Sequence, residues 1–181
     1  ARLFYGHCEF SRDGAVLYTT ETYKDSHDGA IIIRDARSFE IIGEFPSFGS
    51  APHECQIIDD GKTMVITNGG GPSSGAAPNV AYIDIESRRL IRKEELTNRA
   101  LNTGHFVIAG DGSLVVVSAP RTGLASTRPG GVSIQPANKR LRSLTRPKKV
   151  VSGMTGEALS TCIHGTTAAV THPDGNMVTF W

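Results

Sequence analysis

The segment GHCEFSRDGAVLYTTE, residues 6–21, decides the fold because its pattern returns twice along the chain. PHECQIIDDGKTMVITN at residues 52–68 and GHFVIAGDGSLVVVSA at residues 104–119 repeat its order of features: a histidine, an apolar run, a turn glycine and a second apolar run. A fourth, shorter copy begins near Ala158. The turn glycines recur at intervals of about fifty residues, which is the length of one propeller blade; they are Gly14, Gly61, Gly112 and Gly165.

Each copy contains short runs rich in Val, Ile, Thr and Tyr between Gly, Pro, Ser and Asp, and no segment keeps a helical period. Runs such as AIIIR, TMVIT and LVVVS are almost continuously apolar, which indicates strands buried on both faces, as in stacked blades. A two-layer sandwich would alternate more cleanly. We therefore predict one all-β domain, a β-propeller of about four blades with four antiparallel strands each, the last incomplete; the blades cover residues 7–48, 53–98, 105–147 and 157–181.

Four blades leave three arrangements open: a small closed ring, an arc that closes against a second copy, or a piece of a longer propeller of four to eight blades. An open arc would expose two apolar blade faces, which are larger than the apolar patches that monomers usually carry. We therefore expect truncation, self-association through the open faces, or both.

Composition limits the function classes. The chain has 181 residues, of which 39% are hydrophobic, and no apolar run approaches the eighteen residues of a membrane span. Its three cysteines include no CxxC pair, which disfavours a zinc ribbon or a thioredoxin-type site. No GxSxG elbow, P-loop or Rossmann fingerprint occurs.

Basic residues gather in the C-terminal part of the chain. Residues 112–156 carry eight Lys and Arg and no Asp or Glu, and the tract KRLRSLTRPKK covers residues 139–149. This tract lacks the aromatic side chains that stack on single-stranded bases, so we expect no nucleic-acid partner. We interpret it as a solvated outer strand; an anionic partner is the alternative.

The repeated histidines mark a candidate site. If His7, His53 and His105 begin the innermost strand of successive blades, they lie at one mouth of the central channel. The same mouth carries the long loops at residues 22–28, 69–78 and 120–130, and binding residues concentrate on such loops. We take this mouth as the ligand-binding site, and its candidate residues are His7, His53, His105, Glu9 and Glu54.

Two interpretations of these histidines remain open. Converging neutral imidazoles bind transition metals, and glutamate or the cysteines Cys8 and Cys55 could add ligands. In WD-type repeats, however, a Gly-His pair before the inner strand is structural, and both Gly6-His7 and Gly104-His105 have that form. The fourth copy has Glu157 and Ala158 where a histidine would complete the set.

Other catalytic patterns are weaker. HECQI at residues 53–57 lacks the second histidine of HExxH and lies in a predicted strand, whereas that motif requires a helix. Cys55 follows His53 on a strand, and we interpret it as a buried small hydrophobe rather than a nucleophile. Asp25 and Asp28 flank His27 and suggest a lactonase-type calcium site, but this analogy rests on the fold alone.

The segments FYGHCEFSRDGAVLYTTE, IGEFPSFGSAPHECQIIDDGKTMVITNGG and GGVSI resemble an exported bacterial propeller family of unassigned function, domain of unknown function 1513. The resemblance covers most of the chain and is strongest over residues 4–71. It implies a seven-bladed ring about twice as long as this chain, of which four middle blades are present, and a periplasmic location.

Together these observations predict a binding module that holds a small ligand or a protein at the histidine-bearing mouth. The rival hypothesis is a metal-dependent enzyme at the same mouth, hydrolytic and lactonase-like or redox-active, with a transition-metal ion as its cofactor. A purely structural scaffold is the third hypothesis.

Overall fold

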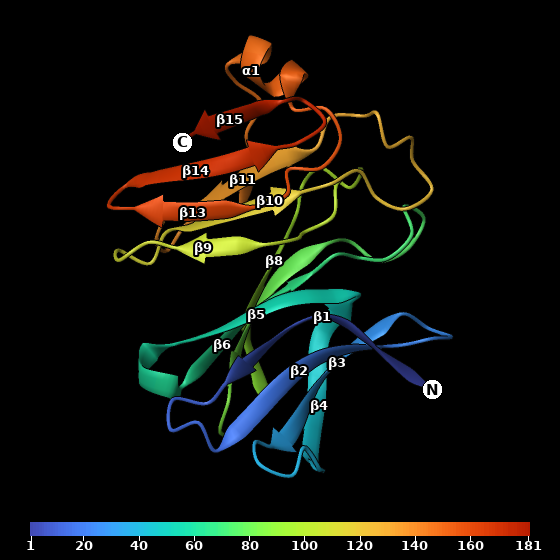
Figure 1. The fold of residues 1–181 in the computed structure, drawn as a ribbon, viewed down its shortest axis with the longest axis vertical. Helices are drawn as coiled ribbons and strands as arrows, with labels where there is room; N and C mark the ends of the chain where they lie inside the picture. Colours follow the sequence, from blue (N-terminus) through green and yellow to red (C-terminus); the bar gives the residue numbers. More distant parts are fainter.

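The computed structural model describes residues 1–181 as an all-β chain with four antiparallel sheets (Figure 1). The first sheet contains β1 (Arg2–Phe10), β2 (Val16–Tyr23), β3 (Asp28–Asp35) and β4 (Ile41–Ser50). The second contains β5 (Pro52–Ile58), β6 (Thr63–Asn68), β7 (Asn79–Asp84) and β8 (Arg89–Glu95). The third contains β9 (Phe106–Ile108), β10 (Leu114–Ser118), β11 (Gly131–Gln135) and β12 (Arg142–Ser143). The last contains β13 (Thr161–His164), β14 (Thr167–His172) and β15 (Met177–Phe180).

Consecutive strands pair within every sheet, so each sheet is an antiparallel meander of the kind that forms a propeller blade. This confirms the predicted fold class, with three four-stranded blades and a last blade of three strands. The first and last sheets lie at opposite ends of the long axis of the molecule (Figure 1), so the blades form an open arc rather than a closed four-bladed ring.

The core consists of the layers between neighbouring sheets. Ile31 and Ile33 of β3 pack with Met64 and Ile66 of β6 in the first layer, and further clusters fill the layers between the later sheets. All six residues of β6 are buried. The continuous apolar runs of the sequence therefore mark strands that are covered on both faces, as predicted.

The turn glycines adopt the backbone conformation that their Asp-Gly and related contexts predict. Gly14, Gly61, Gly112 and Gly165 have φ values of 69°, 94°, 81° and 57°. Residues with a side chain rarely adopt positive φ values, so glycine suits the turn between the first and second strands of each blade.

The basic tract differs from the predicted outer strand. Only Arg142 and Ser143 of residues 139–149 are in a strand, and Lys148 begins the short helix α1 (Lys148–Gly153). Pro147 cannot donate to a strand ladder, and its carbonyl instead accepts hydrogen bonds from the Val150 and Val151 amides in the first helical turn. This helix is too short to cross a bilayer, and no other helix is long and apolar enough to do so.

The two end blades leave large apolar side chains in solvent. Phe4 and Phe10 on β1 are 71% and 53% exposed, and Phe180 on β15 is 70% exposed. In contrast, the outward side of the first sheet carries a charge cluster in which Glu21 binds both Arg2 and Arg34. Self-association through the open faces stays a prediction.

The packing between the first two sheets should be sensitive to cavities. Ile66→Ala removes a completely buried side chain from this layer, and we expect it to lower the free energy of unfolding by about 2–5 kcal/mol. Urea denaturation followed by circular dichroism measures the change. Ile91→Ala, at a β8 position that is 55% exposed, is the matched control and should change stability by no more than about 0.5 kcal/mol. Equal effects of the two changes would contradict this packing.

Candidate metal centre

Irregular inner strands present the histidines. The register of β1 with β2 shifts between Phe4 and Cys8, and His7 lies in this interval. The register of β5 with β6 shifts between Pro52 and Cys55, and His53 lies there. His105 immediately precedes β9. Bulges of this kind redirect side chains and are common beside functional sites, because the affected residues leave the regular alternation of the strand.

Close packing of the first two inner strands requires glycine at position 6. A Cβ atom on Gly6 would lie 1.8 Å from the carbonyl oxygen of His53, well inside any real contact. The Gly-His pair therefore has a structural reason for its glycine. It allows β1 to approach β5 closely enough that His7 and His53 become neighbours.

A buried hydroxyl bridges the inner strands of adjacent blades. The Thr20 hydroxyl lies 2.9 Å from the carbonyl oxygen of His7 and 3.4 Å from that of His53. The Thr67 hydroxyl donates to the carbonyl of Gly104 at 2.7 Å and accepts from the Glu54 amide at 3.1 Å. Sequence reasoning missed these residues, although a hydroxyl side chain follows each turn glycine by six positions; the set is Thr20, Thr67, Ser118 and Thr171.

The three imidazoles converge. The centroid of the His105 ring lies 4.7 Å from the centroids of both His7 and His53, and the latter two are 5.3 Å apart. One nitrogen of each ring lies within 4.8 Å of the others. Two of the rings are partly buried and His7 is exposed, so the cluster opens to solvent on one side. This is the only group of three or more metal-ligating side chains in the chain.

Glu54 holds the His105 ring from the preceding blade. Its Oε2 atom lies 3.1 Å from Nδ1 of His105 and also accepts the Phe106 amide at 3.0 Å. Gln56 donates to the other carboxylate oxygen at 3.1 Å. A carboxylate at Nδ1 favours the tautomer with a proton there, which leaves the Nε2 lone pair free to bind a metal ion.

His53 is kept neutral. Burial, followed by the positive charges that His105 and His7 would carry, lowers the pKa of His53 from 6.5 to about 4. Protonation of several rings at these distances would place like charges together in a half-buried site. Near pH 7 the ring is therefore in the form that binds metal ions.

The remaining predicted residues lie outside the histidine cluster. Burial, and then the charge of Glu54, raises the pKa of Glu9. Cys55 is 2% exposed in the core beside Tyr18 and Met64, and burial raises the pKa of its thiol. Cys8 is exposed, and neither cysteine joins the three imidazoles.

The acidic loop and the opposite hairpin form no second centre. Asp25 and His27 are exposed in the loop between β2 and β3, Asp28 is exposed at the first position of β3, and the three do not gather as metal ligands. Asp60 pairs with Arg12 at 2.6 Å instead. The structure therefore offers no cluster for the lactonase-type calcium site that these residues suggested.

Arg121 organises the loops near His53, and sequence reasoning missed it because a single arginine in a loop gives no signal. Its side chain is 1% exposed and donates to the carbonyls of Gly70, Pro72, Ala76 and Arg99. No carboxylate pairs with it, so its charge is balanced only by carbonyl dipoles. These bonds join the loop at residues 69–78 to the connection before β9. A small cavity of about 90 Å³ lies between Arg121 and His53.

The depressed pKa of His53 predicts a pH effect on stability in the metal-free protein. The unfolded chain takes up a proton near pH 6.5 and the folded chain only near pH 4, so stability should fall as pH drops through this window. Urea unfolding in EDTA at pH 7 and pH 5 measures the loss. His53→Gln should reduce it and His164→Gln, at an exposed position on β13, should not. An unchanged loss in His53→Gln would contradict a neutral His53.

Solved structures with the same architecture are propellers. Hydrazine synthase of Kuenenia stuttgartiensis superposes with a TM-score of 0.72 at 18% identity, over 96% of this chain and 51% of that chain. The β-propeller domain of Cps50 (Swd1) from Myceliophteria thermophila gives 0.64 at 15% identity, over 97% of this chain and 50% of that chain. The chain thus spans about half the length of these structures. At these identities the likeness shows the fold alone.

Sequence comparison supplies the family. No curated protein sequence matches the chain. The sequence pattern of the family described as "Protein of unknown function (DUF1513)" matches residues 1–181, which is the whole chain. This agrees with the resemblance carried by the repeated histidine segments and with the propeller fold. The chain belongs to the DUF1513 family of β-propeller proteins.

Proposed function

We propose that this propeller is a binding module whose mouth holds one divalent transition-metal ion between His7, His53 and His105. The observation that carries the proposal is the convergence of three imidazoles from three successive blades, with ligand nitrogens within 4.8 Å of one another. Zinc-bound imidazole nitrogens lie 2.0–2.1 Å from the ion, so small side-chain rotations would complete the coordination.

The hydrogen bonds of the rings support a ligand role over a purely structural one. A structural histidine would tie its imidazole into the blade. Here the only ring hydrogen bond of the three histidines joins His105 to Glu54, and it leaves the other ring nitrogen free. The structural contribution of the Gly-His pair comes from Gly6 and from backbone carbonyls that accept Thr20 and Thr67.

Three protein ligands leave a coordination position for a small ligand. Neutral imidazole suits zinc, copper, nickel and iron, and the open side of the cluster gives access from solvent. The cavity beside Arg121 adjoins His53 and has room for a group of a few atoms. We propose that a small molecule, rather than a protein side chain, completes the metal coordination there.

The same donor set favours a second candidate function, a metal-dependent enzyme. Three histidines with one open position are the ligands of a zinc ion that activates water, so hydrolysis is the reaction class that the set suits best. A redox reaction would require copper or iron in the same site. We also propose that the protein acts in the periplasm, as the family resemblance implies, whether it is a binding module or an enzyme.

Metal binding tests the proposal directly. We expect the purified protein to bind one equivalent of Zn²⁺ or Co²⁺ in isothermal titration, and Co²⁺ to give the absorption of a tetrahedral or five-coordinate site. His53→Ala removes a central ligand and should weaken binding at least about 100-fold. His164→Ala, which changes an exposed histidine far from the cluster in sequence, is the matched control.

Three results would decide between the hypotheses. Equal metal affinity of the His53→Ala and His164→Ala variants would contradict a metal site at the three histidines. Loss of thermal stability in His53→Ala without any metal binding by the parent protein would favour the scaffold hypothesis. Turnover of ester or lactone substrates that depends on the bound ion would favour the enzyme.

The support that Glu54 gives to His105 makes a separate prediction. Glu54→Gln keeps an acceptor for the Phe106 amide but removes the negative charge at Nδ1 of His105, so metal affinity should fall about 10–100-fold. Titration of Co²⁺ followed by absorption measures the affinity. Glu86→Gln, at an exposed site, should have no effect, and an unchanged affinity in Glu54→Gln would show that the carboxylate does not support the ligand.

A further inference from the structure

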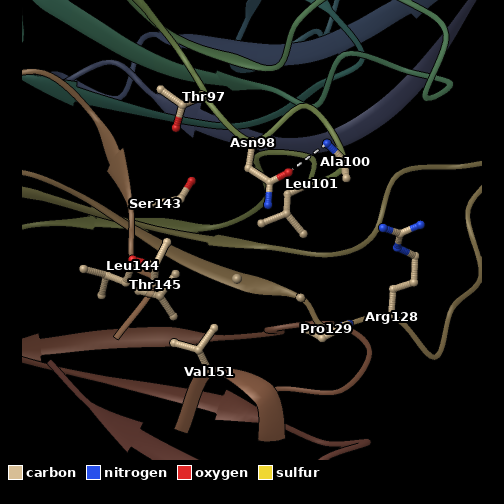
Figure 2. A pocket seen from close by; sticks show the side chains of 13 residues that line it. Thr97, Asn98, Ala100, Leu101, Arg128, Pro129, Ser143, Leu144, Thr145 and Val151 are labelled. Carbon is tan, nitrogen blue, oxygen red and sulfur yellow. Dashed lines mark hydrogen bonds between the residues drawn. The ribbon is translucent and has the colours of Figure 1, made fainter. Parts of the chain in front are cut away.

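A larger cavity lies away from the histidines, at the outer edge of the third sheet. Its volume is about 450 Å³, within the usual range of small-molecule sites. The connection between the second and third sheets forms one wall, and the β12 edge with α1 forms the other. Figure 2 shows Asn98 and Leu101 facing Leu144 and Val151 across this space, with Arg128 at one end. No histidine of the metal centre lines it.

Two polar side chains of this cavity have donor groups without a partner, Arg128 and Asn98. The guanidinium of Arg128 makes no ion pair and no side-chain hydrogen bond in the structure. The Oδ1 atom of Asn98 accepts the Ala100 amide at 3.1 Å (Figure 2), which fixes the side chain and leaves its NH₂ group free to donate. No Asp or Glu is among the lining residues, so nothing in the wall neutralises the arginine.

Both walls carry apolar side chains: Leu101 on the first wall, and Leu144 and Val151 on the second. Leu101 is 5% exposed, and Leu144 and Val151 pack against the buried cluster between the third and fourth sheets. Because these side chains already contact buried residues of the core, the apolar surface is largely preformed without a ligand. A ligand that covers them gains about 25 cal/mol for each Å² of apolar surface removed from water.

The surrounding charge favours an anion. Residues 112–156, which supply one wall, contain eight Lys and Arg and no acidic residue. Within the cavity itself a single cation is present, so one negative charge is enough to match it. A phosphate dianion would leave charge uncompensated in a half-enclosed site, whereas a carboxylate can take the Arg128 fork in a bidentate pair.

We propose that this cavity binds a small monocarboxylate with an aromatic or branched aliphatic body. The carboxylate pairs with Arg128, the amide of Asn98 donates a further hydrogen bond, and the apolar body lies on Leu101, Leu144 and Val151. The site is independent of the metal centre, since the two share no residue. It gives the module a second ligand of a different chemical class.

Competition experiments test the assignment with defined probes. Anilinonaphthalene sulfonate, an aromatic monoanion, reports occupancy by fluorescence, and phenylpropionate should displace it while the isosteric neutral phenylpropionamide should not. Arg128→Gln removes the charge from an exposed side chain that holds no other group, and it should weaken phenylpropionate binding at least about tenfold.

Arg140→Gln is the matched control, because Arg140 belongs to the same basic segment but does not line the cavity. It should leave phenylpropionate binding unchanged. The proposal is overturned by equal losses in both variants, which would show general attraction to the basic surface. Equal binding of the acid and the amide, or no saturable binding of either, would overturn it as well. All titrations are made in EDTA, so the outcome does not depend on the metal centre.

Discussion

Apolar packing between neighbouring sheets is the interaction on which the rest of this structure depends. A single sheet of four short strands cannot bury both of its faces, and β6, with every residue covered, is stable only because a blade lies on each side of it. This stacking fixes where the inner strands lie. Since β1 and β5 carry His7 and His53 and His105 immediately precedes β9, the arrangement of the three histidines follows from the core rather than from contacts among the histidines themselves.

The histidine cluster shows how a regular repeat can support an irregular group of side chains. The inner strands β1 and β5 shift register where His7 and His53 lie, and the outer strands β4 and β8 also shift register against their neighbours. The Thr20 hydroxyl binds the carbonyl of His7 within the irregular part of β1, and the Thr67 hydroxyl binds the carbonyl of Gly104 just before β9. Arg121 does the same for the loop carbonyls above them. Side chains thus donate hydrogen bonds to backbone carbonyls where the regular strand pairing is interrupted.

The sequence predicted the architecture because its signals are local and repeated. Turn glycines, continuous apolar runs and the position of each histidine are all visible in single segments such as residues 6–21. The bulges, the Glu54 to His105 pair and the buried Arg121 depend on contacts between residues about fifty positions apart, which no local pattern encodes. The basic tract was assigned wrongly as a full strand for the opposite reason: tertiary packing and Pro147 decided its conformation, and strand propensity did not.

The origin of the three imidazoles in three separate sheets has a mechanical consequence. An ion bound by all of them would act as a cross-link between blades that are otherwise joined by packed faces and hydrogen bonds. In a stacked repeat protein, ends can separate without unfolding the middle, and separation between any of the first three blades would have to break a coordination bond. Ligation by the three histidines would then suppress partial opening between these blades, so that the first three blades would unfold as one unit.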